Sequence, residues 1–231
     1  MKKRIAITGS NGTIGEILKK GLTDFEITGI NLPEVDLRNY EQVLNAVQDH
    51  SAIVHLGWNS KTENLLNENI DVDNMIMAFN VYRAALETKV SRVIMASSIH
   101  ANAFYNWKGP GLMSVDMVPV PDSPYGADKV FIESLGRYFA QKNLEVIAVR
   151  FGGINPKNTS PSTHEYLKGE RAAWLSHNDC VSLIRAIIKA EKIPNNFVLM
   201  YAVSDNAGRI HDISNPFEWI PQEKAEDFQA I

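Results

Sequence analysis

The chain has 231 residues, of which 45% are hydrophobic and 22% are charged, and its net charge is −4. This length predicts one α/β domain with room for a small appended lobe, and the mildly acidic charge argues against nucleic-acid partners and against binding to a membrane surface. No apolar run approaches the roughly 20 residues of a membrane span. The single cysteine, Cys180, leaves neither an internal disulfide nor a cysteine metal site, so we expect a cytoplasmic protein that holds no metal.

A glycine-rich turn follows the first predicted strand, an apolar run that ends at Thr8. Gly9 lets the chain turn, Gly12 lets the backbone approach phosphates, and Gly15 lets the next helix pack against the sheet. That helix, predicted at Glu16–Leu22, directs its first amides and its dipole toward an anion. Between a strand and a helix this spacing predicts a site for a dinucleotide pyrophosphate, and the alternative is a plain strand-to-helix turn.

The second predicted strand, Phe25–Ile30, ends where dinucleotide-binding folds usually carry an acidic residue that binds the adenosine ribose. Asn31 stands there instead. An asparagine side chain can hydrogen-bond a hydroxyl but does not repel a 2′-phosphate, so both NAD and NADP remain open as cofactors, with NAD slightly preferred. Arg38 is close enough in sequence to meet such a phosphate, and a solvated surface arginine is the simpler interpretation.

The remaining elements alternate between strands and helices. Strands are predicted at Glu34–Leu37, Ala52–Leu56, Arg92–Ser98, Glu145–Arg150 and Phe197–Ala202, and helices at Tyr40–Val47, Glu68–Thr88, Tyr125–Gln141 and Val181–Ala190. This alternation predicts a doubly wound parallel sheet of the Rossmann type, covered by helices on both faces. We expect one domain over 1–231, with a small C-terminal substrate-covering lobe drawn mainly from 155–231. The loop Trp58–Thr62 either reaches substrate or is a plain connection.

Three residues carry the predicted chemistry. The four-residue spacing of Tyr125 and Lys129 puts both on one face of a helix, and Ser98 ends a strand. A phenol with an unperturbed pKa near 10 is a poor base, but a neighbouring ammonium favours the phenolate and lowers that pKa. With Ser98 holding the reacting hydroxyl, the phenolate could take a proton from an alcohol while hydride leaves for a nicotinamide. His100 is either a substrate ligand or a loop histidine that binds local backbone groups.

Three segments resemble the extended short-chain dehydrogenase/reductases, the NAD-dependent epimerase/dehydratase family, and the likeness covers nearly the whole chain. These segments are Thr8–Gly15, Ala96–Ser98 and Tyr125–Lys129. Within the family, other segments are similar to the branch that holds uronate dehydrogenases and archaeal NAD-dependent glucose-6-phosphate dehydrogenases. Those segments are Ser97–His100, Glu165–Gly169, Ala173–Cys180 and Tyr201–Asn206.

The resemblance implies a role for each site residue. It makes Ser98, Tyr125 and Lys129 the catalytic residues. It places the pyrophosphate on Gly9, Gly12, Thr13, Ile14 and Gly15, the adenine beside Asp36 and Leu37, and a ribose beside Leu56 and Gly57. Further cofactor contacts would be Asn11, Asn31, Tyr125 and Lys129. The sugar would be held by Ser60, Ser98, His100 and Arg171.

The chain also departs from the family pattern. The branch usually has Asn where Ile99 stands, and uronate dehydrogenases have Ser where Gly153 stands. Two polar sugar contacts are thereby missing, so the substrate need not be a uronate. Arg171 either meets a carboxylate or phosphate of the substrate or lies on the surface. The acid after the second strand is replaced by Asn31, and the segment that follows it is short.

We therefore expect an NAD(P)-dependent dehydrogenase that oxidises C1 of a cyclic sugar to a lactone, the sugar being an aldose, a uronate or a sugar 6-phosphate. One alternative is a nucleotide-sugar epimerase or dehydratase that keeps its NAD tightly bound. Another is a non-catalytic protein that senses dinucleotides. The two long helices, at Glu68–Thr88 and Tyr125–Gln141, are candidates for the contact of a homodimer.

Overall fold

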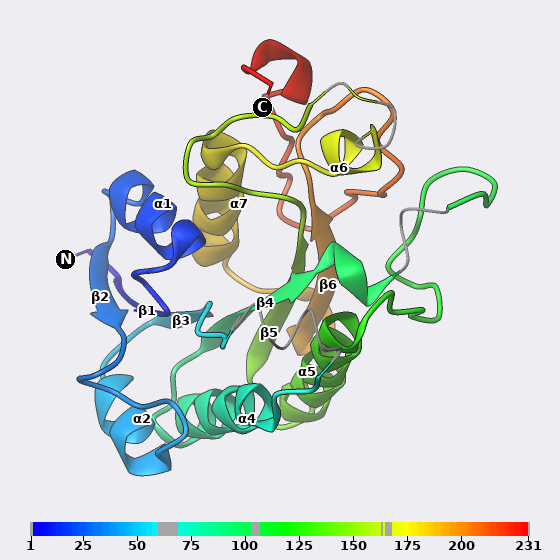
Figure 1. The fold of residues 1–231 in the computed structure, drawn as a ribbon. Coiled ribbons are helices and arrows are strands. Elements are labelled where there is room, and N and C mark those ends of the chain that lie inside the picture. The colour runs from blue at the N-terminus through cyan, green and yellow to red at the C-terminus, as the bar shows by residue number, and fades with distance from the viewer. Residues whose placement is uncertain (1, 60–68, 103–106, 163, 165–167, 231) are drawn as a thin grey trace.

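The computed structural model describes residues 2–59, 69–102, 107–162, 164 and 168–230. Its centre is a six-stranded sheet in the order β2-β1-β3-β4-β5-β6, and all five neighbouring pairs are parallel (Figure 1). The strands are β1 (Arg4–Thr8), β2 (Glu26–Ile30), β3 (Ala52–His55), β4 (Arg92–Ser98), β5 (Glu145–Phe151) and β6 (Phe197–Ala202). Parallel neighbours require crossovers, and the chain supplies them as helices, as the alternation predicted.

Helices cover both faces of the sheet, which explains why β1, β3, β4 and β5 are almost entirely buried. On one face lie α1 (Thr13–Gly21) and α7 (His177–Lys189), and on the other lie α2 (Tyr40–Ala46), α4 (Val72–Glu87) and α5 (Pro124–Ala140) (Figure 1). Each face has its own apolar core. The sequence prediction of a doubly wound α/β sheet is confirmed.

Side-chain caps fix where the helices near the sheet edge begin. The Ser123 hydroxyl accepts the Gly126 N–H at the start of α5, and Ser176 accepts the Asp179 N–H at the start of α7. Asp71 caps α4 in the same way. Such caps satisfy amides that have no partner within the helix. The first residues of α5 are therefore held in a defined place.

The predicted strand at Glu34–Leu37 is wrong. These residues form turns after β2, the edge strand of the sheet in the part of the chain described here. The Val35 N–H donates to the Asn31 carbonyl, and the Asp36 N–H donates to the Gln42 side chain, so local bonds replace a strand ladder. The first helix also starts earlier than predicted, at Thr13. Glu68, where the long helix was predicted to begin, lies outside the described residues, and α4 begins at Val72.

The C-terminal part of the chain adds elements to the sheet and then packs against α7. It supplies α7 and β6, together with the short helix α6 (Lys168–Ala172). The buried Asp179 carboxylate accepts the backbone N–H groups of Gln222 at 2.7 Å and Glu223 at 3.2 Å, which ties the tail to α7. Trp219 and Cys180 are buried in the adjoining core. Among the described residues, no helix combines the length and the apolar character needed to cross a membrane.

Candidate active site

A crevice of about 910 Å³ lies at the carboxyl edge of the sheet, between the glycine turn and α5. Ligands of open parallel sheets bind at this edge. The sequence-predicted residues that line the crevice are Gly9, Gly12, Thr13, Ile14, Gly15, Leu56, Ser98, His100, Tyr125 and Lys129. The structure therefore brings the glycine turn and the three predicted catalytic residues to one cavity. Within the described residues, no cluster of side chains has the composition of a metal site.

The glycine turn is shaped so that only glycine fits at its tightest points. Gly9 has φ of +66°, and a Cβ there would lie 2.7 Å from the backbone nitrogen of Gly57. A Cβ on Gly15 would lie 2.5 Å from Ser10 Cα. Gly12 caps α1 without a side chain, so no side chain occupies the first amides of that helix. This bare helix start fits the pyrophosphate of a dinucleotide.

The buried Thr8 hydroxyl fixes the backbone that packs against the glycine turn. Thr8 Oγ1 accepts the N–H groups of Leu56 at 3.2 Å and Gly57 at 3.1 Å, and lies 2.7 Å from His55 Nδ1. Burial, with a smaller effect of Lys129, lowers the pKa of His55 to about 3. The neutral His55 and Thr8 thus fix the segment after β3 against the glycine turn. Sequence reasoning missed both residues, because their pairing depends on the β1–β3 register.

Asn31 binds the glycine turn rather than standing open at the end of β2. Its Oδ1 accepts the Asn11 N–H at 3.1 Å, and its Nδ2 donates to Ser10 Oγ at 2.7 Å. Asn11 lines a second groove, beside the start of α1 and α7. The oxygen and the nitrogen of the Asn31 side-chain amide therefore both have protein partners. The residue contributes no negative charge at the place where dinucleotide-binding folds usually carry an acidic residue.

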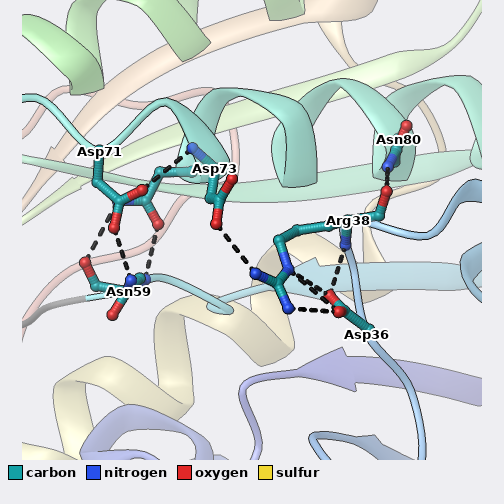
Figure 2. A network of polar contacts seen from close by, with 7 residues as sticks. Asp36, Arg38, Asn59, Asp71, Asp73 and Asn80 are labelled. Carbon is teal, nitrogen blue, oxygen red and sulfur yellow. Dashed lines mark hydrogen bonds and ion pairs between the residues drawn. The ribbon is translucent and has the colours of Figure 1, made fainter.

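Arg38 is held by carboxylates at the start of the second crossover (Figure 2). Its guanidinium lies 2.6 Å from Asp36 and 3.1 Å from Asp73, and the bond to Arg38 lowers the pKa of Asp36. Asn80 donates to the Leu37 and Arg38 carbonyls and fixes this turn on α4. Arg38, Asp36 and the buried Leu37 lie outside the residues that line the crevice. Arg38, which was considered as a partner for a 2′-phosphate, is thus already paired with two carboxylates.

Ser98, Tyr125 and Lys129 meet in the crevice. Ser98 favours the ionised form of the Tyr125 phenol and so opposes the rise of its pKa, and Ser98 Oγ accepts the His100 N–H at 3.2 Å. The Lys129 ammonium donates to the Ala96 carbonyl at 2.9 Å and lies 3.3 Å from the centre of the Trp58 ring. An ammonium so close to an indole face is in cation–π contact.

Burial dominates the acid–base properties of this group. It raises the pKa of Tyr125, and the hydrogen bond from Ser98 opposes that shift. Burial also lowers the pKa of Lys129 to about 7, although Asp128 and Glu133 favour its charged form. The expected net lowering of the phenol pKa is therefore wrong for this arrangement, because burial outweighs the effects that favour the phenolate. The lysine is itself desolvated, so its positive charge is only partly present near neutral pH.

His100 faces a carboxylate that sequence reasoning did not single out. Its Nδ1 lies 2.9 Å from Asp122 Oδ2, and its ring centre lies 5.9 Å from that of Tyr125. The Asp122 Oδ1 accepts the Ser123 hydroxyl at 2.9 Å. Asp122 and His100 both line the crevice. The His100 imidazole and the Asp122 carboxylate therefore form the wall beside the phenol.

A buried ion pair lies behind the three predicted catalytic residues. Glu133, one helical turn after Lys129, accepts two bonds of 2.8 Å from Arg150 and a third from the Ser97 hydroxyl. Ser97, Arg150 and Tyr201 lie in register across β4, β5 and β6, and Arg150 also donates to the Tyr201 hydroxyl at 3.0 Å. The network joins α5 to the end of β4, and so fixes Lys129 relative to Ser98.

Two predicted substrate contacts are not brought to this cluster. The Arg171 guanidinium donates to Ser160 Oγ at 2.7 Å and to the carbonyls of Pro161 at 2.9 Å and Ala225 at 3.0 Å, and it does not line the crevice. Its partners are the chain's own loops. Ser60 lies outside the described residues. Gly57 packs against the glycine turn and Leu37 rather than lining the cavity.

Comparison with known proteins agrees with this geometry. Residues 5–162 match the model of the NAD dependent epimerase/dehydratase family. The chain is 30% identical to an L-arabinose 1-dehydrogenase (NAD(P)(+)) of Haloferax volcanii, over 89% of this chain and 90% of the relative. It is 28% identical to a uronate dehydrogenase of Agrobacterium fabrum, over 98% and 87%. A crystal structure of a mutant uronate dehydrogenase from Agrobacterium tumefaciens in complex with NAD is similar at 26% identity and a TM-score of 0.80, covering 97% of this chain and 86% of that one.

Proposed function

The chain belongs to the NAD dependent epimerase/dehydratase family, and we propose that it is an NAD(P)-dependent dehydrogenase that oxidises C1 of a cyclic sugar to a lactone. The observation that carries the proposal is the convergence of Ser98, Tyr125 and Lys129 on the crevice that begins at the glycine turn. The sugar dehydrogenases among its relatives support the same conclusion.

Each residue has a defined task in this proposal. NAD(P) supplies the hydride acceptor when bound, and its pyrophosphate is held by the bare start of α1 beside Gly12. Ser98 orients the C1 hydroxyl, and Tyr125 accepts the hydroxyl proton while hydride leaves C1. Lys129 holds hydroxyls of the cofactor ribose and stabilises the phenolate, to the extent that it is charged. Because burial raises the pKa of Tyr125, oxidation should be faster at alkaline pH.

The test is net reduction of NAD and of NADP, followed by the absorbance of the reduced nicotinamide, with aldoses, uronates and sugar 6-phosphates. We expect turnover with at least one sugar class and loss of nearly all turnover in Tyr125→Phe. Full turnover in that variant would refute the mechanism. A nucleotide-sugar epimerase or dehydratase would return its hydride and accumulate no reduced cofactor. A dinucleotide sensor would bind the cofactor without turnover on any sugar.

The proposal includes a homodimer formed through α4 and α5, which lie side by side (Figure 1). Their outer faces expose large apolar residues, among them Phe79, Phe131 and Tyr138, each of which is 42 to 50% exposed. A second copy would bury these faces against the same faces of the first. Light scattering should give twice the 25.8 kDa of one chain, and a Phe79→Glu, Phe131→Glu double variant should give one chain mass.

The remaining parts of the proposal concern the lobe and the compartment. We assign the covering of the substrate to the segment 155–231, because its loops and α6 lie beside the crevice end that holds Gly153 and Glu170. The one cysteine is buried and reduced, which fits a cytoplasmic enzyme.

A further inference from the structure

Among its described lining residues, the crevice carries more acidic than basic side chains. Four acidic residues are among the described residues that line it: Asp71, Asp122, Asp128 and Glu170. The basic side chains in that described lining are His100 and Lys129, and no arginine is among them. Among the described lining residues, only these two basic groups could neutralise an anionic substrate, so the surroundings of each bear on what the crevice accepts.

Lys129 is already engaged. Its Nζ donates to the Ala96 carbonyl and rests on the Trp58 indole. In the proposed function it also binds the cofactor, next to Tyr125. The desolvation of Lys129 further reduces the positive charge that it presents near neutral pH. It is therefore a poor counter-ion for a carboxylate or phosphate on the substrate.

His100 cannot supply a net positive charge either. Its Nδ1 lies 2.9 Å from the Asp122 carboxylate, whose side chain is 16% exposed. If the imidazole were protonated, Asp122 would neutralise it, and if it were neutral, the pair would be negative. In neither case does the pair carry a net positive charge, and its imidazole ring lies 5.9 Å from the Tyr125 ring, centre to centre. A sugar hydroxyl can donate to such a carboxylate in a charge-assisted hydrogen bond, but a substrate anion is repelled.

The arginine that could have met an anion is bound elsewhere. Three hydrogen bonds of 2.7 to 3.0 Å hold Arg171 to Ser160, Pro161 and Ala225, and Glu226 lies 3.5 Å from its Nε. Moving it to the crevice would break these bonds and leave buried acceptors without donors. Gly153 lines the crevice with open space where a Cβ would stand, so no side chain there supplies a polar contact.

We propose that the substrate is a neutral cyclic aldose, without a carboxylate or phosphate group, whose hydroxyls donate to the carboxylate wall at Asp122. This inference rests on the proposed function and narrows it to one of the three sugar classes. It places hydroxyl recognition in Asp122 and His100, and it assigns Arg171 to the fold of the lobe.

The experiment compares sugars that differ only at C6. Initial rates are measured with D-galactose against D-galacturonate, and with D-glucose against D-glucuronate and D-glucose 6-phosphate. We expect kcat/KM for the neutral sugar to exceed that of its charged partner by at least about tenfold, equal to about 1.4 kcal/mol. An equal or higher value for a charged partner would overturn the inference and leave the proposed function standing. If none of the sugars is turned over, the proposed function itself is overturned.

A charge variant tests the cause. In Asp122→Asn the ratio of neutral to charged kcat/KM should fall by at least about threefold, because the repelling charge is removed while the side-chain shape is kept. Asp205→Asn is the matched control, since that carboxylate is half exposed and lies outside the crevice. It should leave the ratio unchanged. A ratio that moves equally in both variants, or in neither, would contradict the role given to Asp122.

Discussion

The buried pair Glu133–Arg150 gives the sharpest prediction. Arg150 is fully buried and Glu133 is 3% exposed, and two bonds of 2.8 Å join them. In Glu133→Gln the shape is nearly kept, but the guanidinium loses its counter-charge, and the new amide group turns an N–H toward other N–H donors. An uncompensated buried charge costs about 3–5 kcal/mol. At the lower value, the midpoint of thermal unfolding should fall by roughly 6–12 °C for a chain of this size.

The same change should reach the active site. Glu133 joins the helix of Lys129 to Ser97, the neighbour of Ser98. Loss of the Glu133 contacts should displace Ser98 and Lys129 relative to the Tyr125 phenol. A small misplacement of reacting groups strongly lowers the rate of the chemical step. We expect kcat to fall at least about tenfold in folded Glu133→Gln, with a smaller change in KM.

A double-mutant cycle decides whether the pairing causes these effects. Thermal and denaturant unfolding are measured for Glu133→Gln, Arg150→Met and the double variant. The double variant should recover more than half of the stability lost in Glu133→Gln, because it no longer buries an unpaired charge. Glu26→Gln, which removes a carboxylate from an exposed pair with Arg4, is the control and should unfold close to the wild type. Additive losses in the double variant would refute the reasoning.

Three further predictions follow from other contacts. Burial lowers the pKa of Lys129 from 10.5 to about 7, so between these pH values the unfolded chain binds one proton more than the folded chain. The free energy of unfolding, measured with denaturant, should therefore rise by about 2 kcal/mol from about pH 7 to about pH 9, and in Lys129→Met it should depend less on pH. Asn31→Asp adds the missing charge at the end of β2, so kcat/KM for NADP should fall at least about tenfold relative to NAD; an unchanged ratio would show that the 2′ position lies elsewhere. Gly9→Ala places a Cβ 2.7 Å from Gly57 at φ of +66°, so calorimetric titration should show at least about tenfold weaker cofactor binding, whereas wild-type affinity would mean that the turn does not hold the pyrophosphate.

Local patterns explain what the sequence could predict. The glycine turn and the Tyr125–Lys129 spacing act over a few residues, and the strands at Arg92–Ser98 and Phe197–Ala202 have the predicted bounds because both are buried apolar runs. The alternation at Glu34–Leu37 was too short to distinguish a strand from turns, and no further strand lies beyond β2 among the described residues to pair with it.

The supporting contacts could not be predicted, because they join residues that are distant in the chain. Ser97, Arg150 and Tyr201 meet only because three strands share one register, and Thr8 meets His55 for the same reason. The sign of the Tyr125 pKa shift was missed because a sequence shows the nearby lysine but not the burial of both groups. The one signal that could have indicated their contact is that Ser97, Arg150 and Tyr201 each stand one residue before the end of a strand.

The indole that rests on the Lys129 ammonium gives this protein a built-in optical probe. Of the four tryptophans, Trp58 lines the crevice, whereas Trp107, Trp174 and Trp219 do not line it. A molecule that enters beside Lys129 changes the surroundings of Trp58 far more than those of the other three tryptophans. Intrinsic fluorescence can therefore report occupancy in the absence of turnover, and a Trp58→Phe chain provides the blank against which that signal is read.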